Sequence, residues 1–264
     1  GNVLDPGSFD DALDVDVAFY LIHSMGAGGD YAERDRRAAR NFSEAAGEAD
    51  LDRVIYLGGL GTDQDDLSPH LRSRREVERV LALGEYDLTV LRAAIIIGAG
   101  SISFQLIRQL AGRLPVMITP KWVHTECQPI AIRDVIGYLV GVLDRPETAG
   151  ETYEIGGPEV LTYAEILRGT RRQLGGKLRI VPVPVLTPRL SSWWIRFVTD
   201  VDPAVARPLI DGVKNSVVVT DTRIQDIIPR DRLSFEAAVA EALQAEPITA
   251  ETRRARAGRL LRGQ

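Results

Sequence analysis

Apolar and polar positions alternate along the first part of the chain in a way that predicts strands separated by helices. Three short apolar runs rich in β-branched residues indicate strands, at residues 15–22, 53–57 and 88–91. The first run is so continuously apolar that we expect it to be buried on both faces of a sheet. The segments 30–49 and 69–83, which follow the first two runs, have the period of amphipathic helices. Buried strands joined by helices of this length are typical of βαβ units around a parallel sheet.

The pattern becomes more mixed toward the C-terminus. Short strands are predicted at residues 115–118, 128–132 and 150–155, and helices at 135–143 and 164–174, capped by Asp134 and Thr162. After residue 175 the regular alternation gives way to an extended proline-rich run, to Trp193 and Trp194, and to a short apolar strand at 217–219. We therefore divide the chain into a core of residues 1–158, a smaller segment of residues 159–250 and a basic tail of residues 251–264.

Composition narrows the range of partners. The 264 residues include 32 basic and 37 acidic side chains, a net charge of −5, which argues against nucleic acid as the main partner. A single cysteine, Cys127, cannot form an internal disulfide, and one thiol with three histidines gives no ligand set for structural zinc. No run reaches the roughly 18 apolar residues of a membrane span. These features predict a cytoplasmic protein.

The order of motifs resembles the short-chain dehydrogenase/reductase superfamily. The segments that carry the resemblance include YLIHSMGAGGD, RVIYLGGLG, LTVLRAAIIIGAGS, QPIAIRDV and GETYEIGGPEVLTYAEI, and they extend from residue 1 to about residue 170. They are similar to the atypical and extended branch of that superfamily, which contains NmrA-like and sugar-epimerase-like proteins. The resemblance implies a doubly wound parallel α/β sheet of the NAD(P)-binding Rossmann type with a smaller C-terminal α+β segment, and NAD or NADP as cofactor of the complete protein.

The same resemblance leads us to expect an N-terminally incomplete Rossmann core. It places the strand that ends near Val3 third in the sheet, so the glycine-rich turn that holds the cofactor pyrophosphate would precede residue 1. Residues 26–29 are glycine-rich but lack the spacing of that turn, and they are either a loop near the cofactor or a structural turn. The strand at residues 15–22 would then form an open edge of the sheet, where a partner chain or a second copy could associate.

Two candidate catalytic residues follow from the resemblance. Family members use a Ser after the fifth strand and a Tyr-x-x-x-Lys on the next helix. Here the serine position falls at Gly58 or Gly59, while His70 and Arg74 stand at the tyrosine and lysine positions. His70 could serve as a general acid near neutral pH, and Arg74 could hold a ribose or phosphate. Alternatively, His70 only begins a helix and Arg74 pairs with Glu78 at i, i+4.

Candidate cofactor contacts lie after two other predicted strands. His23, Ser24 and Met25 follow the strand at residues 15–22, where this fold places a loop beneath the cofactor, although a histidine there is more often a hydrogen-bonding loop residue. Arg92 and Ala93 match a family segment that usually reads Arg-Pro and lines the nicotinamide, and a plain strand end is the alternative.

The sequence leaves two functions open. The first is an NAD(P)-binding oxidoreductase-like or sugar-nucleotide-epimerase-like protein with an unknown small-molecule substrate, which could be inactive as this chain. The second is a non-catalytic NAD(P)-sensing regulator, or an accessory or assembly protein of the respiratory complex I type. The simultaneous loss of Ser, Tyr and Lys favours the second. The residue that would distinguish NAD from NADP belongs to the second strand of the family fold, which residues 1–264 do not match.

Overall fold

The structure is a computed structural model that describes residues 1–24, 30–61, 67–183 and 199–245. Met25, the glycine-rich residues 26–29, Trp193 and Trp194, and the predicted basic tail 251–264 lie outside the described residues.

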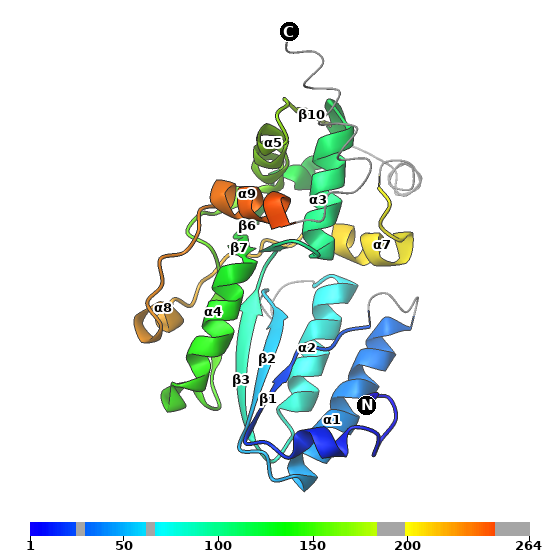
Figure 1. The fold of residues 1–264 in the computed structure, drawn as a ribbon. Helices are drawn as coiled ribbons and strands as arrows, with labels where there is room; N and C mark the ends of the chain where they lie inside the picture. Colours follow the sequence, from blue (N-terminus) through cyan, green and yellow to red (C-terminus); the bar gives the residue numbers. More distant parts are fainter. Residues whose placement is uncertain (25–29, 62–66, 184–198, 246–264) are drawn as a thin grey trace.

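A four-stranded parallel sheet forms the centre of the lower part of the molecule (Figure 1). Its strands lie in the order β1 (Val17–Tyr20), β2 (Arg53–Gly59), β3 (Asp87–Ala93) and β8 (Thr152–Ile155). The register places Phe19 opposite Ile55, and Tyr56 opposite Val90. The predicted parallel sheet is confirmed, and with helices on both faces the fold is a doubly wound α/β sheet.

The two faces of the sheet are covered by different helices. On one face, α1 (Tyr31–Glu48) and α2 (Pro69–Leu81) pack on a core that includes Tyr20, Tyr56 and Val90. On the other face, α4 (Ile132–Leu143) packs on Ile55, Leu91 and Tyr153. The α4 helix belongs to the connection between β3 and β8, which advances across the sheet in the same direction as the two earlier connections. Because α4 lies on the opposite face, this connection has the opposite hand, an exception to the usual rule for parallel strands.

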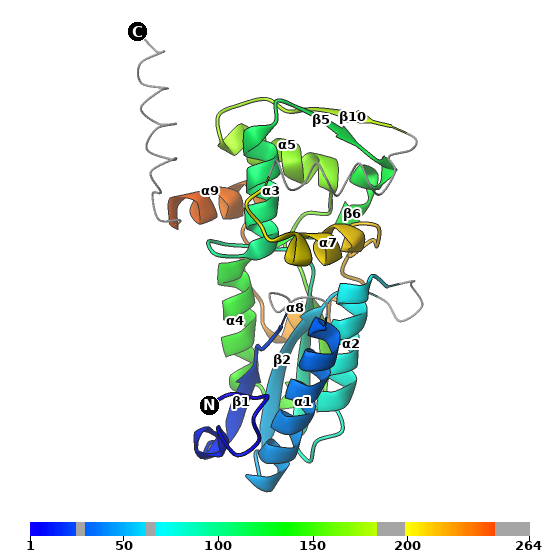
Figure 2. The ribbon, with the colours of Figure 1, turned by 90° about the vertical axis from the view of Figure 1, so that its right-hand side faces the viewer.

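The upper unit is built around a second apolar core at the carboxyl edge of the sheet (Figure 2). Its helices are α3 (Ile102–Arg113), α5 (Tyr163–Gln173), α7 (Pro203–Gly212) and α9 (Phe235–Ala245), with α8 (Arg223–Ile227) lower, beside β8. Its short strand pairs are β4 (Ile96–Ile97) with β7 (Ile130–Ala131), β5 (Val116–Thr119) with β10 (Arg179–Pro182), and β6 (Glu126–Cys127) with β9 (Leu161–Thr162). Phe104, Ile166 and Val239 share this core, so α3 packs with the C-terminal segment rather than with the sheet.

The prediction that residues 15–22 are buried on both faces was wrong. Val15, Phe19 and Leu21 are 48%, 40% and 51% exposed, whereas Tyr20 is buried. Tyr20 points toward α1 and α2, while Phe19 lies on the face of α4, which does not extend over β1. Among the described residues β1 pairs only with β2, so one face and one backbone edge of this apolar strand stay open.

The predicted helix ends were right at one position and wrong at another. Thr162 caps α5 in a capping box, in which its hydroxyl accepts from the Glu165 N–H and Glu165 accepts from the Thr162 N–H. Asp134 does not cap α4, because the helix begins earlier, at Ile132. The buried Asp134 carboxylate instead accepts a hydrogen bond from the Leu233 N–H at 2.9 Å. The predicted strand 217–219 is reduced to one bridge between Val217 and Cys127.

Candidate functional site

The described residues predicted to form a site lie at the carboxyl edge of the parallel sheet. His23 and Ser24 follow β1, Gly58 and Gly59 end β2, and Arg92 and Ala93 end β3. His70 and Arg74 occupy the first turns of α2, which begins at the same edge. This is the edge at which open α/β sheets bind their ligands. Met25 lies outside the described residues.

A buried carboxylate, Asp35, connects these elements. Its Oδ1 accepts a hydrogen bond from the Ser24 N–H at 2.6 Å, and its Oδ2 accepts from the Ser73 hydroxyl at 3.3 Å and from the Arg74 guanidinium. Asp35 is only 1% exposed. Through these bonds the loop after β1 is held against α2.

Sequence reasoning missed Asp35. A signal was present: Tyr31, Asp35, Ala38 and Phe42 form one helical stripe, and all four are buried. A carboxylate on the apolar stripe of an amphipathic helix requires a partner in the interior, so this position pointed to a buried ion pair.

Arg74 is engaged by the protein itself. Its guanidinium pairs with Asp35 and also donates to the Ile22 carbonyl at 3.4 Å, while its own carbonyl accepts from the Tyr56 hydroxyl at 3.1 Å. The side chain is buried. The guanidinium is therefore held toward α1 and the end of β1, and a role in ribose or phosphate binding stays a prediction.

His70 has the chemistry of a neutral imidazole. Burial, the Arg74 charge and His23 together lower its pKa to about 4. Its Nδ1 is buried and has no hydrogen-bond partner among the described residues. At pH 7 such a ring can accept a hydrogen bond at an unprotonated nitrogen but is not the imidazolium that a general acid requires. A neutral ring suits hydrogen bonding, and a catalytic role for His70 stays a prediction.

His23 lies near His70 and Arg74, and its side chain is exposed. Partial desolvation and the positive charge of Arg74 lower its pKa, whereas Asp35 acts in the opposite direction. The two histidines and Arg74 thus form one electrostatic cluster at the carboxyl edge.

The glycines at the end of β2 are explained by packing. A Cβ atom on Gly58 would lie 3.1 Å from the Tyr56 ring, and one on Gly59 would lie 3.0 Å from Leu71 of α2. Both distances are shorter than ordinary contacts. The absence of side chains here allows α2 to pack closely on the end of the strand.

Arg92 turns toward α2. Its guanidinium pairs with Glu78, which also pairs with Arg75, and Arg75 donates to the Gly61 carbonyl at 2.5 Å. The Ala93 carbonyl accepts the Leu60 N–H at 2.8 Å. These contacts fix the ends of β2 and β3, and a contact with nicotinamide stays a prediction for both residues.

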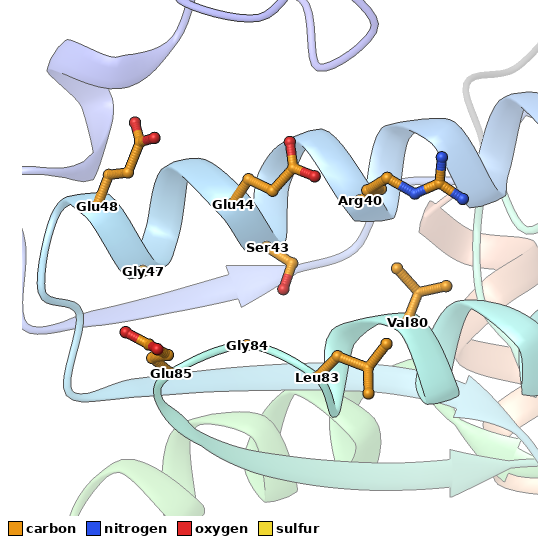
Figure 3. Close-up of a pocket in the computed structure, with 9 residues that line it drawn as sticks. All are labelled: Arg40, Ser43, Glu44, Gly47, Glu48, Val80, Leu83, Gly84 and Glu85. Atoms are coloured by element: carbon orange, nitrogen blue, oxygen red, sulfur yellow. The ribbon is translucent and has the colours of Figure 1, made fainter.

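A surface groove lies at the other end of the molecule, between the C-terminal ends of α1 and α2 (Figure 3). Its volume is about 580 Å³. Three of its lining residues are acidic and one is basic: Glu44, Glu48, Glu85 and Arg40. This charge balance does not suit the diphosphate of a dinucleotide, so the groove is not a second candidate for that ligand.

The described residues contain neither a metal cluster nor a membrane-spanning helix. Within the described ranges, no group of three or more His, Cys, Asp and Glu side chains could hold a metal ion. None of the helices described here combines the length and the apolar character needed to cross a membrane. The only cysteine, Cys127, is buried in the upper core, and burial raises the pKa of its thiol to about 12.

Sequence comparison gives distant relatives. No protein-family model matches the sequence. The 40 kDa subunit of mitochondrial NADH-ubiquinone oxidoreductase from Neurospora crassa is 26% identical over 163 residues, which are 59% of this chain and 42% of that protein. Mitochondrial NADH dehydrogenase (ubiquinone) 1 alpha subcomplex subunit 9 from Dictyostelium discoideum is 27% identical over 146 residues, 53% of this chain and 41% of that protein. The chain spans less than half the length of these curated relatives.

Solved structures share the fold over nearly the whole chain. An NADPH-dependent quinone oxidoreductase from Escherichia coli, complexed with NADPH, matches with a TM-score of 0.71 and 18% identity over 92% of this chain and 82% of its own. A nucleoside-diphosphate-sugar epimerase from Staphylococcus aureus matches with a TM-score of 0.70 and 13% identity over 91% of this chain and 82% of its own. This chain therefore has the Rossmann-type fold found in NAD(P)-binding short-chain dehydrogenases/reductases and nucleotide-sugar epimerases.

Proposed function

We propose that this chain contributes the nicotinamide side of an NAD(H) or NADP(H) site in a non-catalytic accessory protein of the respiratory complex I type. Curated relatives are subunits of that complex, and structural neighbours include a protein complexed with NADPH. The Nδ1 of His70 lies at the carboxyl edge, is buried and has no partner among the residues that the structure describes, which suits a hydrogen-bond donor such as the carboxamide of a nicotinamide.

One observation carries the non-catalytic assignment. At the two positions where the family resemblance implies a proton-donating tyrosine and a lysine, this chain has a neutral histidine and an arginine paired with Asp35. A general acid needs a releasable proton near neutral pH, and a buried ion pair withdraws Arg74 from the substrate. Among the described residues, the site therefore keeps features for binding, while these two positions offer no proton donor near neutral pH.

Cofactor titration and a turnover assay test the proposal together. We expect saturable quenching of tryptophan fluorescence by NADH or NADPH, and no oxidation of either cofactor with panels of carbonyls, quinones and sugar nucleotides. His70→Phe should weaken cofactor binding, whereas His124→Phe, at an exposed position outside the cluster, should leave it unchanged. Turnover that His70→Phe abolishes would contradict the non-catalytic assignment. A chain that binds neither NADH nor NADPH would contradict the proposed cofactor site.

A second function, an oxidoreductase or a sugar-nucleotide epimerase, is favoured by the structural neighbours and by the position of His23 and His70 at the ligand-binding edge. The small-molecule substrate of such an enzyme is unknown. Turnover that requires a substrate and that His70→Phe abolishes would favour this enzymatic function.

Partners and location complete the proposal. The open edge of β1 is where we place a partner chain or a second copy. We propose a reducing compartment such as the cytoplasm, which the single buried thiol supports, and note that the curated relatives are mitochondrial proteins. Fractionation of cells that express a tagged chain tests the location.

A further inference from the structure

The groove between the C-terminal ends of α1 and α2 combines apolar and acidic side chains (Figure 3). Val80 and Leu83 supply the apolar part, and Leu83 is 83% exposed, more than the other exposed large apolar side chains of the described residues. Glu44 and Glu48 line the groove from α1, and Glu85 lines it from the turn after α2. We refer to these five residues as the acidic groove. An exposed leucine beside three carboxylates suits an occupant that is both apolar and cationic.

The charges of the acidic groove are not compensated within the described part of the chain. Glu44, Glu48 and Glu85 take part in none of the ion pairs between described residues. Arg40 is the one basic residue that lines the groove. In addition, α1 ends here at Glu48 without a basic residue in its last turn, and the negative end of a helix favours cations. Two independent sources of negative potential therefore meet in the groove.

The negative charge extends from the groove along the amino edge of the sheet. Exposed acidic residues precede or begin each of the first three strands, and these are Asp14, Asp16, Asp50, Asp52, Glu85 and Asp87. Such a concentration of one sign attracts a positively charged polypeptide and speeds its association.

The chain itself contains a segment with the matching chemistry, the basic tail of residues 251–264. It has five arginines and one acidic residue, a net charge of +4. Because the whole chain carries −5, residues 1–250 carry −9. Leu260 and Leu261 stand between Arg259 and Arg262, so this short stretch offers apolar and cationic groups side by side, as the acidic groove requires.

The position of the groove favours the tail of another molecule over the tail of the same one. α9 ends at Ala245 in the upper unit, whereas the groove lies where α1 ends, at the opposite end of the molecule (Figure 1). The 18 residues of α1 alone span about 27 Å from the carboxyl edge to the groove. Six residues beyond Ala245 the chain has advanced at most about 22 Å. Leu260 would therefore reach its own groove only if most of the preceding residues were held extended, at a cost in conformational entropy.

We propose that the basic tail of one copy of this chain binds the acidic groove of a second copy. Arg259 and Arg262 pair with the groove carboxylates, and Leu260 and Leu261 cover Leu83. Reciprocal binding of the two tails closes a twofold dimer. The proposal goes beyond the cofactor site, which lies at the carboxyl edge, and does not depend on it.

Analytical sedimentation of the full chain and of a chain that ends at Ala250 tests the proposal. We expect the full chain to dimerise, and the truncated chain to sediment as a monomer at the same concentration. Raising the salt from roughly 0.05 M to 0.5 M should weaken the dimer about tenfold or more, because salt screens exposed charge pairs.

Matched variants connect dimerisation to the acidic groove. Glu48→Lys and Glu85→Lys should each weaken the dimer about tenfold, whereas Glu126→Lys, an equal change of charge at an exposed position in the upper unit, should not. Leu83→Ser should also weaken the dimer, whereas Val160→Ser, at an exposed apolar position of the upper unit, should leave it unchanged. Circular dichroism melts verify that all five variants fold.

A mixing experiment separates binding between copies from binding within one molecule. The double variant Glu48→Lys, Glu85→Lys keeps the tail but not the groove charge, and the chain that ends at Ala250 keeps the groove but not the tail. We expect each to be a monomer alone and the two together to form a one-to-one heterodimer.

Three results would overturn the proposal. The first is a full chain that sediments as a monomer, and the second is a pair of complementary chains that do not associate. The third is a dimer that persists in the truncated chain or in the folded groove variants, which would assign self-association to another surface such as the edge of β1. NADH and NADPH titrations of the same samples should not respond to Glu48→Lys, so a failure of the cofactor site and a failure of the tail contact are measured separately.

Discussion

The Arg74 guanidinium of α2 lies against the Asp35 carboxylate of α1, in an ion pair that is almost fully withdrawn from solvent. The Ser24 N–H and the Ser73 hydroxyl donate to the same carboxylate. The pair therefore joins two helices and the loop after β1 at the candidate site. Its position makes it a determinant of stability as well as of site geometry.

Asp35→Asn should destabilise the protein by about 3–5 kcal/mol, because it leaves the buried Arg74 charge without a counter-charge. The double variant Asp35→Leu, Arg74→Met should recover most of that loss, since it removes both charges. Urea denaturation at pH 7 measures both. Glu33→Gln, which breaks an exposed pair with Arg36, is the control and should leave the midpoint unchanged. An Asp35→Asn midpoint equal to that of wild type would contradict the structural role of the pair.

Stability should fall as the pH decreases from about 6.5 toward 4, in part because of His70. Burial and the Arg74 charge lower its pKa to about 4 in the folded state, below the ordinary value of 6.5, so the unfolded chain binds a proton that the folded chain excludes. Inside this window, His70 lowers the free energy of unfolding by at most about 1.4 kcal/mol for each unit by which the pH falls. Urea melts across pH 4.5–7.5 should show a flatter profile for His70→Asn than for wild type. The exposed His124→Gln should keep the wild-type profile, and identical profiles for all three proteins would refute the assignment.

Cys127 should be unreactive in the native protein. Burial raises the pKa of the thiol to about 12, so almost no thiolate forms at pH 8, and the side chain has no access to solvent. A thiol-disulfide reagent such as DTNB should label the native chain slowly and the urea-unfolded chain at once and stoichiometrically. Rapid labelling without denaturant would show that the upper core opens readily.

Two glycine substitutions should have opposite effects on stability. A Cβ atom on Gly157 would lie 2.3 Å from the Pro129 carbonyl oxygen, a backbone atom, so Gly157→Ala should cost about 2 kcal/mol or more. Gly47 lies inside α1 with only a side-chain atom of Glu85 at 3.9 Å, so Gly47→Ala should stabilise by up to about 1 kcal/mol. Thermal melts of the two variants beside wild type provide the measurement. A Gly157→Ala variant as stable as wild type would show that β7 and the end of β8 are not packed this closely.

The amino-acid sequence by itself determined most of the local elements and the parallel character of the sheet. Apolar runs and helical periods identified β2, β3, α1 and α2, and Thr162 marked the start of α5. These features depend on interactions between residues close in sequence, or on the rule that consecutive strands joined by helices lie side by side in parallel. Because the strands are parallel, the strand ends that carry His23, Gly58 and Arg92 lie at one edge of the sheet.

The tertiary structure alone decided which side chains meet and which faces stay open. Asp35 and Arg74 lie 39 residues apart in the sequence, and only the fold brings them together as an ion pair. The apolar run at β1 predicted burial, but the exposure of Phe19 depends on how far α4 extends across the opposite face. Hydrophobic pattern encodes the tendency of a segment to be buried, whereas actual burial depends on long-range packing, which a linear pattern does not specify.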